Sequence, residues 1–141
     1  MSDPIEIRLD GAPVAKGRPR FNRATGRAYT PEKTARFEDR LALAAQLAMR
    51  GRPLLDGPLQ LLFMAFIEVP ASWSVRKKAK ALGGEIYPTG RPDWENLAKT
   101  IDALNKIVWV DDSLIVTATV HKRYSDRPRT EISVSPMANV A

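Results

Sequence analysis

The feature that most constrains the fold of this chain is an apolar run of eleven residues, Leu59 to Val69, which lies between Pro58 and Pro70. A run of this kind predicts either a buried helix or a strand that is covered on both faces. Its length, with prolines and turn signals on either side, favours the strand, because proline interrupts regular structure. We therefore expect a long strand that is buried on both faces.

Three other segments are predicted as strands from their side-chain patterns. Pro4–Asp10 alternates apolar and polar residues, which is typical of a half-buried strand. Leu114–Tyr124 alternates in the same way and is rich in β-branched residues. After a turn at Ser125–Pro128, the segment Arg129–Val134 is expected to return as the second strand of a hairpin.

Two helices are predicted from their ends. Thr30-Pro31-Glu32 is expected to begin a helix, with Thr30 as its cap, that ends near Arg50. Ser72–Leu82 is expected to form a short basic helix, whose cations could contact a nucleic acid or could form a solvated face. With a further helix described below, the element order β-α-β-α-α-β-β predicts one compact α+β domain over residues 1–141.

The composition indicates a polyanionic partner. A length of 141 residues is close to that of one domain, and a hydrophobic share of 44% is enough for a core. The net charge of +6 points to nucleic acid or to a membrane surface. The first residues lack the features of a signal peptide, and no apolar run approaches the length of a membrane span. We expect a soluble, cytoplasmic protein without a membrane partner.

Several kinds of metal site are excluded by composition. The chain has no Cys and only one His, so thiolate sites and multi-histidine zinc sites cannot form. The single histidine, His121, lies in the middle of a predicted strand and is interpreted as structural. Any bound metal must therefore depend on carboxylates.

The segment Lys16–Arg27 has five cations, and no acid occurs between Asp10 and Glu32. A proline and two glycines argue against regular structure, so a loop is expected. Aromatic residues, Phe21 and Tyr29, accompany the cations. A basic segment with interleaved aromatics suits contacts with phosphates and stacking on bases. The alternative is a solvated loop whose phenylalanine packs into the core.

Acidic residues lie at both ends of the segment Gly90–Ser113. Asp93 follows a proline and is a good helix N-cap. Asp111 and Asp112 come where the next strand begins. Between them, an apolar stripe at helical spacing predicts one helix, and its members are Leu97, Ile101, Leu104 and Val108. On a different face the same helix would present Glu95, Lys99 and Asp102.

If this helix packs on the following strand, Asp93, Glu95 and Asp112 can converge. Carboxylates at one point repel each other unless a cation neutralises them, and hard oxygen ligands suit Mg²⁺. The alternative is structural. Acids in a first helical turn complement the helix dipole, Glu95 and Lys99 could form an ordinary ion pair, and paired aspartates in a turn are commonly solvated.

The same segment contains an Arg-Pro-Asp-x-Glu-Asn-Leu-x-Lys run, an Asp-Ala-Leu-Asn segment and a Trp-x-Asp-Asp-Ser element, in that order. The N-terminal region adds a Pro-x-x-Lys-x-Arg-Pro-Arg segment. In these motifs the chain resembles the RusA family of Holliday-junction resolvases, the endodeoxyribonucleases of bacteria and their phages. The corresponding residues are Arg91–Lys99, Asp102–Asn105, Trp109–Ser113 and Pro13–Arg20.

The resemblance implies a RusA-like mixed β-sheet with helices packed on it, in a homodimer that resolves four-way DNA junctions by paired symmetric nicks during recombination and repair. It implies that Asp93, Glu95 and Asp112 are catalytic and hold Mg²⁺, with Mn²⁺ able to substitute. It also implies that Lys99 stabilises the phosphate or the leaving group. The residues expected to contact DNA are Lys16, Arg18, Arg20, Arg23, Arg27, Arg91 and Asn96.

The sequence departs from the family pattern in two places. Glu95 stands where the family usually has Asp, and the spacing from Lys99 to Asp102 is one residue shorter than expected. A longer side chain shifts the ligating oxygen, which can reduce the rate where positioning is critical. One alternative is therefore a catalytically weak or inactive protein of the same fold that binds branched DNA. Another is a basic scaffold or metabolic protein whose acids are helix caps.

Overall fold

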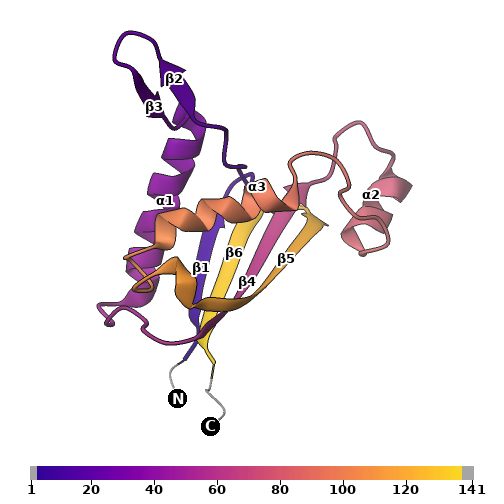
Figure 1. Ribbon diagram of the computed structural model, residues 1–141. Helices are drawn as coiled ribbons and strands as arrows, with labels where there is room; N and C mark the ends of the chain where they lie inside the picture. Colours follow the sequence, from indigo (N-terminus) through magenta and orange to yellow (C-terminus); the bar gives the residue numbers. More distant parts are fainter. Residues whose placement is uncertain (1–2, 138–141) are drawn as a thin grey trace.

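The long apolar run forms β4 (Leu59–Glu68), an inner strand of a mixed four-stranded sheet in the computed structural model, which describes residues 3–137. The strand order is β1 (Ile5–Asp10), β6 (Arg129–Pro136), β4 and β5 (Ile115–Ser125), as Figure 1 shows. β4 is parallel to β5 and antiparallel to β6, which also pairs with β1. The predicted α+β class is confirmed.

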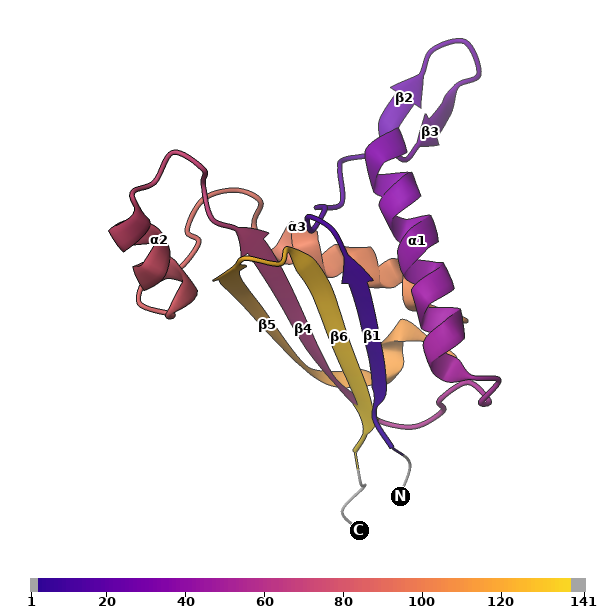
Figure 2. The ribbon, with the colours of Figure 1, turned by 180° about the vertical axis from the view of Figure 1, so that it is seen from behind.

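One face of this sheet is covered by helices, and the other is open (Figure 2). Alternate residues of β4 are buried against α1 (Glu32–Met49) and the segment that begins with α3 (Trp94–Ala98). Leu62, on the opposite face, is 36% exposed, so the prediction of a strand buried on both faces was wrong. The members of the core include Leu59, Leu61, Phe63, Ala65, Phe37, Leu41, Ala45 and Leu97.

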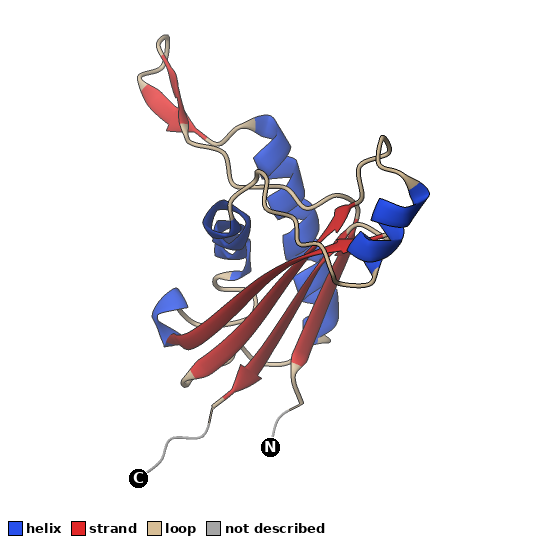
Figure 3. Cartoon of the chain, turned by 90° about the vertical axis from the view of Figure 1, so that its right-hand side faces the viewer, coloured by secondary structure: helices blue, strands red, loops and turns tan. Residues whose placement is uncertain are grey.

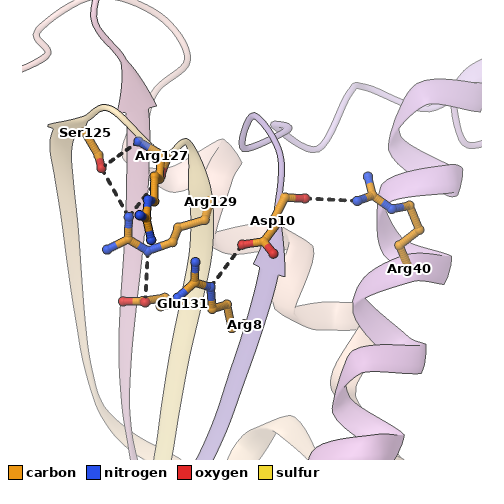
Figure 4. A network of polar contacts seen from close by, with 7 residues as sticks. All are labelled: Arg8, Asp10, Arg40, Ser125, Arg127, Arg129 and Glu131. Carbon is orange, nitrogen blue, oxygen red and sulfur yellow. Dashed lines mark hydrogen bonds and ion pairs between the residues drawn. The ribbon is translucent and has the colours of Figure 1, made fainter.

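Polar side chains cover part of the open face and shield its apolar residues from solvent (Figure 4). The Arg129 guanidinium lies 3.8 Å from the ring centroid of Phe66, and its Nε donates to Glu131 Oε1 at 3.0 Å. On β1, Arg8 Nε donates to Asp10 Oδ1 at 3.0 Å. An apolar strand residue can therefore lie on a solvated face when a cation stacks on it.

The expected hairpin between the last two strands is not formed. β6 lies between β1 and β4, so Ile132 is opposite both Ile7 and Phe63. β6 pairs with a strand on each of its edges, whereas the exposed first half of β5 suits a sheet edge. Strands that are consecutive in sequence are not always neighbours in a sheet, and here β4 separates them.

The basic segment forms a second, two-stranded sheet that projects beyond α1 (Figure 1). Its strands are β2 (Arg20–Asn22) and β3 (Arg27–Tyr29), so the prediction of an irregular loop was wrong. The Asn22 side chain accepts hydrogen bonds from two backbone N–H groups of the turn, and Gly26 has a φ of 70°. These two residues form the turn that the composition alone did not identify. Phe21 is 65% exposed, which excludes its packing in the core.

The helices differ from expectation mainly at their ends. α1 begins at Glu32 with Pro31, not Thr30, at the N-cap position. The short basic helix α2 (Val75–Leu82) is capped by Ser74, whose hydroxyl accepts from the Lys77 N–H. No helix in residues 3–137 is both long and apolar enough to cross a membrane.

The helix predicted from Asp93 to Val108 is shorter than its apolar stripe. α3 spans five residues and continues as a 3₁₀ helix, η1 (Lys99–Leu104). The Thr100 hydroxyl donates to the Leu97 carbonyl at 2.6 Å, which competes with the α-helical hydrogen-bond pattern. Leu104 and Val108 are nevertheless fully buried, so the stripe identified the core correctly although not the helix type.

Candidate active site

Asp93 occupies the N-cap position of α3, but its carboxylate does not cap the helix. Its backbone carbonyl accepts from the Leu97 N–H at 3.1 Å, while the side chain makes no capping hydrogen bond and is exposed. Leu97 is fully buried and fixes the first turn against the core. The turn therefore presents the Asp93 carboxylate to solvent, where it can bind a ligand.

Glu95 and Lys99 lie one turn apart on the same exposed side of this segment. Lys99 Nζ is 3.5 Å from Glu95 Oε1. An exposed pair of this kind contributes about 1 kcal/mol or less to stability. Either side chain can therefore leave the pair for a phosphate or a cation at little cost.

The two acids at the other end of the motif have different roles. Asp112 Oδ1 accepts a hydrogen bond of 2.7 Å from Nε1 of Trp109, which is fully buried, so the carboxylate has a fixed orientation. Asp111 instead accepts from the Ser113 N–H at 3.0 Å and caps η2 (Asp112–Leu114). Its hydrogen bonds with Ser113 lower the pKa of Asp111 below its usual range. Asp111 is thus a structural cap, and Asp112 is the oriented acid.

Among residues 3–137, no three His, Cys, Asp or Glu side chains lie close enough to hold a metal ion together. The expected convergence of Asp93, Glu95 and Asp112 is therefore not present in the chain. The donor chemistry still fits a hard cation, because all three carboxylates are exposed and the second oxygen of Asp112 remains free of Trp109. Mg²⁺ commonly takes only one or two carboxylates and completes its shell with water and substrate phosphates.

Lys16, which was expected to contact DNA, forms ion pairs within the protein. Its Nζ lies 3.0 Å from Asp102 Oδ2 and 3.2 Å from Glu38 Oε2, and its backbone N–H donates to the Asn96 carbonyl at 2.8 Å. Burial opposes the charge, but the hydrogen bonds to Asp102 and Glu38 outweigh it and raise the pKa of Lys16. Lys16 therefore ties the start of the basic segment to both α1 and the α3–η1 segment.

A basic groove leads from the hairpin to the turn before Asp93. Its volume is about 670 Å³ and its cations are Arg18, Arg20, Lys33 and Arg91. Of the other residues expected to contact DNA, Arg23 and Arg27 are exposed on the hairpin, and Asn96 is half-buried on α3. The groove brings four cations to the turn that precedes the exposed Asp93 carboxylate, and such a surface suits a phosphate backbone.

Sequence reasoning missed three residues at this site. The Trp94 side chain is 59% exposed on the first turn of α3. The sequence could have indicated this exposure, because Trp94 is an aromatic residue that lies outside the apolar stripe. Lys33 lines the groove, although its place on a helix gave no signal. Lys122 Nζ donates to the Gly90 carbonyl at 2.7 Å and holds the approach to Asp93 on β5, a contact that sequence distance concealed.

Comparisons with known proteins cover most of this chain. A family model described as Endodeoxyribonuclease RusA matches residues 10–135, which include the hairpin, the groove and both ends of the acidic motif. A protein of Bacillus subtilis (strain 168), named "Uncharacterized protein YqaN", is 36% identical over 137 residues. That match covers 94% of this chain and 96% of the Bacillus protein.

Proposed function

Because the chain belongs to the RusA endodeoxyribonuclease family, we propose that it is a divalent-metal-dependent nuclease that resolves Holliday junctions by paired symmetric nicks during DNA recombination and repair. One observation supports this proposal above the others. The basic groove ends at the turn where Asp93, Glu95 and Lys99 are exposed together. A DNA backbone in the groove would bring a phosphate to these side chains.

The groove favours recognition of DNA by its backbone. Arg18, Arg20 and Arg91 can contact phosphates, which position DNA without reading its sequence. The exposed hairpin, with Phe21 near its turn, can follow a bent or branched backbone beyond the groove. Selectivity for junctions would then depend mainly on the shape of the DNA.

In the proposed mechanism Lys99 acts on the reacting phosphate. Its ion pair with Glu95 is exposed and weak, so the ammonium can turn to a phosphate and stabilise the negative charge of the transition state. Trp109 keeps the Asp112 carboxylate in one orientation and so limits the reorganisation that reaction requires. Mg²⁺ or Mn²⁺, bound by one or two of the carboxylates of Asp93, Glu95 and Asp112 together with oxygens of the substrate phosphate, would supply an activated water and neutralise charge on the phosphate.

The substrate symmetry favours a homodimer. A four-way junction has near two-fold symmetry, and its resolution needs two matched nicks, which a C2 dimer can make with two equivalent sites. We propose that such a dimer acts in the cytoplasm on branched DNA.

The test is cleavage of a synthetic four-way junction beside a linear duplex of the same sequence, with Mg²⁺ and with EDTA. We expect paired symmetric nicks in the junction alone, lost with EDTA and in Asp112→Asn. The control variant is Asp126→Asn, which changes an exposed aspartate in the β5–β6 turn. If the wild-type chain neither binds nor nicks the junction, the proposed activity is refuted.

A different result would separate binding from chemistry. Tight junction binding without nicks in either metal would contradict the nuclease proposal and indicate a protein that only binds branched DNA. Glu95→Asp, which restores the usual family residue, would then show whether position 95 is responsible for the loss.

A further inference from the structure

We infer that α2 is a second DNA-binding surface, which contacts the phosphate backbone of a duplex arm on the side of the Asp93 turn opposite the hairpin. The inference rests on the proposed function, because it extends the substrate contacts of the same site. Four cations lie within the eight residues of α2, and no acid occurs between Glu68 and Glu85. Those cations are Arg76, Lys77, Lys78 and Lys80.

Acids in the part of the chain that the structure describes do not neutralise these charges. Among the ion pairs of residues 3–137, none includes a cation of α2. The open face of the sheet provides the contrast, because Arg8 and Arg129 there each pair with a neighbouring acid (Figure 4). The α2 surface therefore keeps its full positive charge for an external anion.

The placement of the cations disfavours the helix itself. Arg76 and Lys77 lie in the first turn of α2, where the helix dipole favours acids. Arg76 and Lys80 are four residues apart, so two like charges repel on one side of the helix. Arg76 and Lys80 have no ion-pair partner in residues 3–137, and a repulsive arrangement of this kind is expected where a ligand compensates for it.

Aromatic contacts fix α2 to the sheet. The rings of Trp73 and Tyr124 meet edge to face with centroids 5.3 Å apart. Lys77 Nζ lies 4.0 Å from the Trp73 ring centroid, and the Ser74 cap orders the first turn. Because α2 is already held against β5, its cations can bind a backbone without the entropic cost of ordering a loop.

The position of α2 suits a DNA that crosses the active-site turn. The hairpin and α2 project on opposite sides of the start of α3, both at the end of the molecule away from the two termini (Figures 1 and 3). The loop that follows α2 leads directly to Arg91, and Lys122 holds that loop at the Gly90 carbonyl. DNA bound at Asp93 would therefore have a basic surface on either side.

The salt dependence of junction affinity tests this inference. Wild-type, Lys80→Gln and Arg76→Gln/Lys80→Gln proteins are compared by fluorescence anisotropy with a four-way junction in EDTA over a range of NaCl concentrations. Each lost phosphate contact should reduce the slope of log K against log[NaCl] by about 0.9, and the double variant by about 1.8. Arg50→Gln is the matched control, because it removes an exposed cation at the far end of α1.

The outcomes separate this inference from the proposed function. If the salt slopes of the α2 variants equal that of Arg50→Gln, the inference is overturned. The proposed resolvase activity would still stand in that case, provided that the wild-type chain binds and nicks the junction. An absence of junction binding by the wild-type chain would overturn both. Thermal unfolding of the variants should be unchanged or shifted upward, because a repulsive pair is removed. If the double variant unfolds, the inference is tested by the salt slope of Lys80→Gln alone, compared with that of Arg50→Gln.

Discussion

At the residue scale, the acidic motif joins the core to the exposed site through a single side chain. Trp109 is fully buried, yet its Nε1 reaches the exposed Asp112 carboxylate at 2.7 Å. Trp109 lies three residues before Asp112, so a residue of the core can fix this acid of the pair. Asp111 instead caps its own turn. The orientation of Asp112 is therefore a property of the core.

We predict that Trp109→Phe lowers activity more than its effect on stability explains. The phenyl ring keeps most of the apolar contact but has no N–H, so Asp112 loses its only side-chain donor in residues 3–137. Loss of a group that orients a metal ligand commonly reduces activity by about 10- to 100-fold. Junction cleavage is measured at a temperature where the variant is folded.

Val108→Ala is the control for this prediction, because Val108 is fully buried beside Trp109 but has no polar contact with the site. It should cost about 1–3 kcal/mol of stability and leave the cleavage rate of the folded protein near that of wild type. Equal activities of the two variants would contradict the positioning role of Trp109.

The second prediction at this scale concerns Lys16. The pKa of Lys16 is raised in the folded protein, so the stabilisation is fully present below the ordinary lysine pKa of 10.5 and declines as the pH rises through the folded pKa. Lys16→Met should therefore be less stable than wild type at pH 8, and the difference should narrow above about pH 10.5. Urea unfolding of both proteins between pH 8 and pH 11.5 measures this, and a constant difference would exclude the ion pairs as its source.

At the element scale, local signals located most helices and strands, but they did not determine how the strands pair. The alternation in Arg129–Val134 gave the strand, and the turn before it suggested a hairpin with β5. The actual neighbours of β6 are β4 and β1, and the pairing with β1 joins segments more than a hundred residues apart, which no local pattern indicates. Likewise, the hairpin turn was not predicted, because it depends on two residues, Asn22 and Gly26, and not on a periodic pattern.

We predict that Gly26→Ala weakens DNA binding without changing the stability of the domain. Gly26 has a φ of 70°, so a side chain there costs about 1–2 kcal/mol in the hairpin. The hairpin lies outside the core, so the melting temperature should stay the same while junction affinity falls. Ala24→Ser, an exposed change in the same turn, is the control. A lower melting temperature for Gly26→Ala would show that the hairpin is part of the cooperative unit.

At the scale of the whole molecule, the fold places basic surfaces on either side of the acidic motif. The groove, the hairpin and α2 are basic, and the exposed acids of the motif lie between them. The sequence predicted most of these residues individually, because each belongs to a short motif or run. It did not predict that Lys16 pairs with Glu38 and Asp102, since such contacts join segments that only the complete fold brings together.

The last prediction follows from the proposed dimer. Two cuts made by one dimer on opposite strands linearise a supercoiled plasmid that extrudes a cruciform, whereas one cut gives a nicked circle. Wild-type and Asp112→Asn chains with different tags are co-expressed, and the mixed dimers are purified by both tags in turn. We expect mixed dimers to accumulate nicked circles and wild-type dimers to give linear plasmid, because each chain supplies the acids for one cut. Linear product from the mixed dimers, at the wild-type rate, would mean that one active chain makes both cuts and would contradict two matched sites.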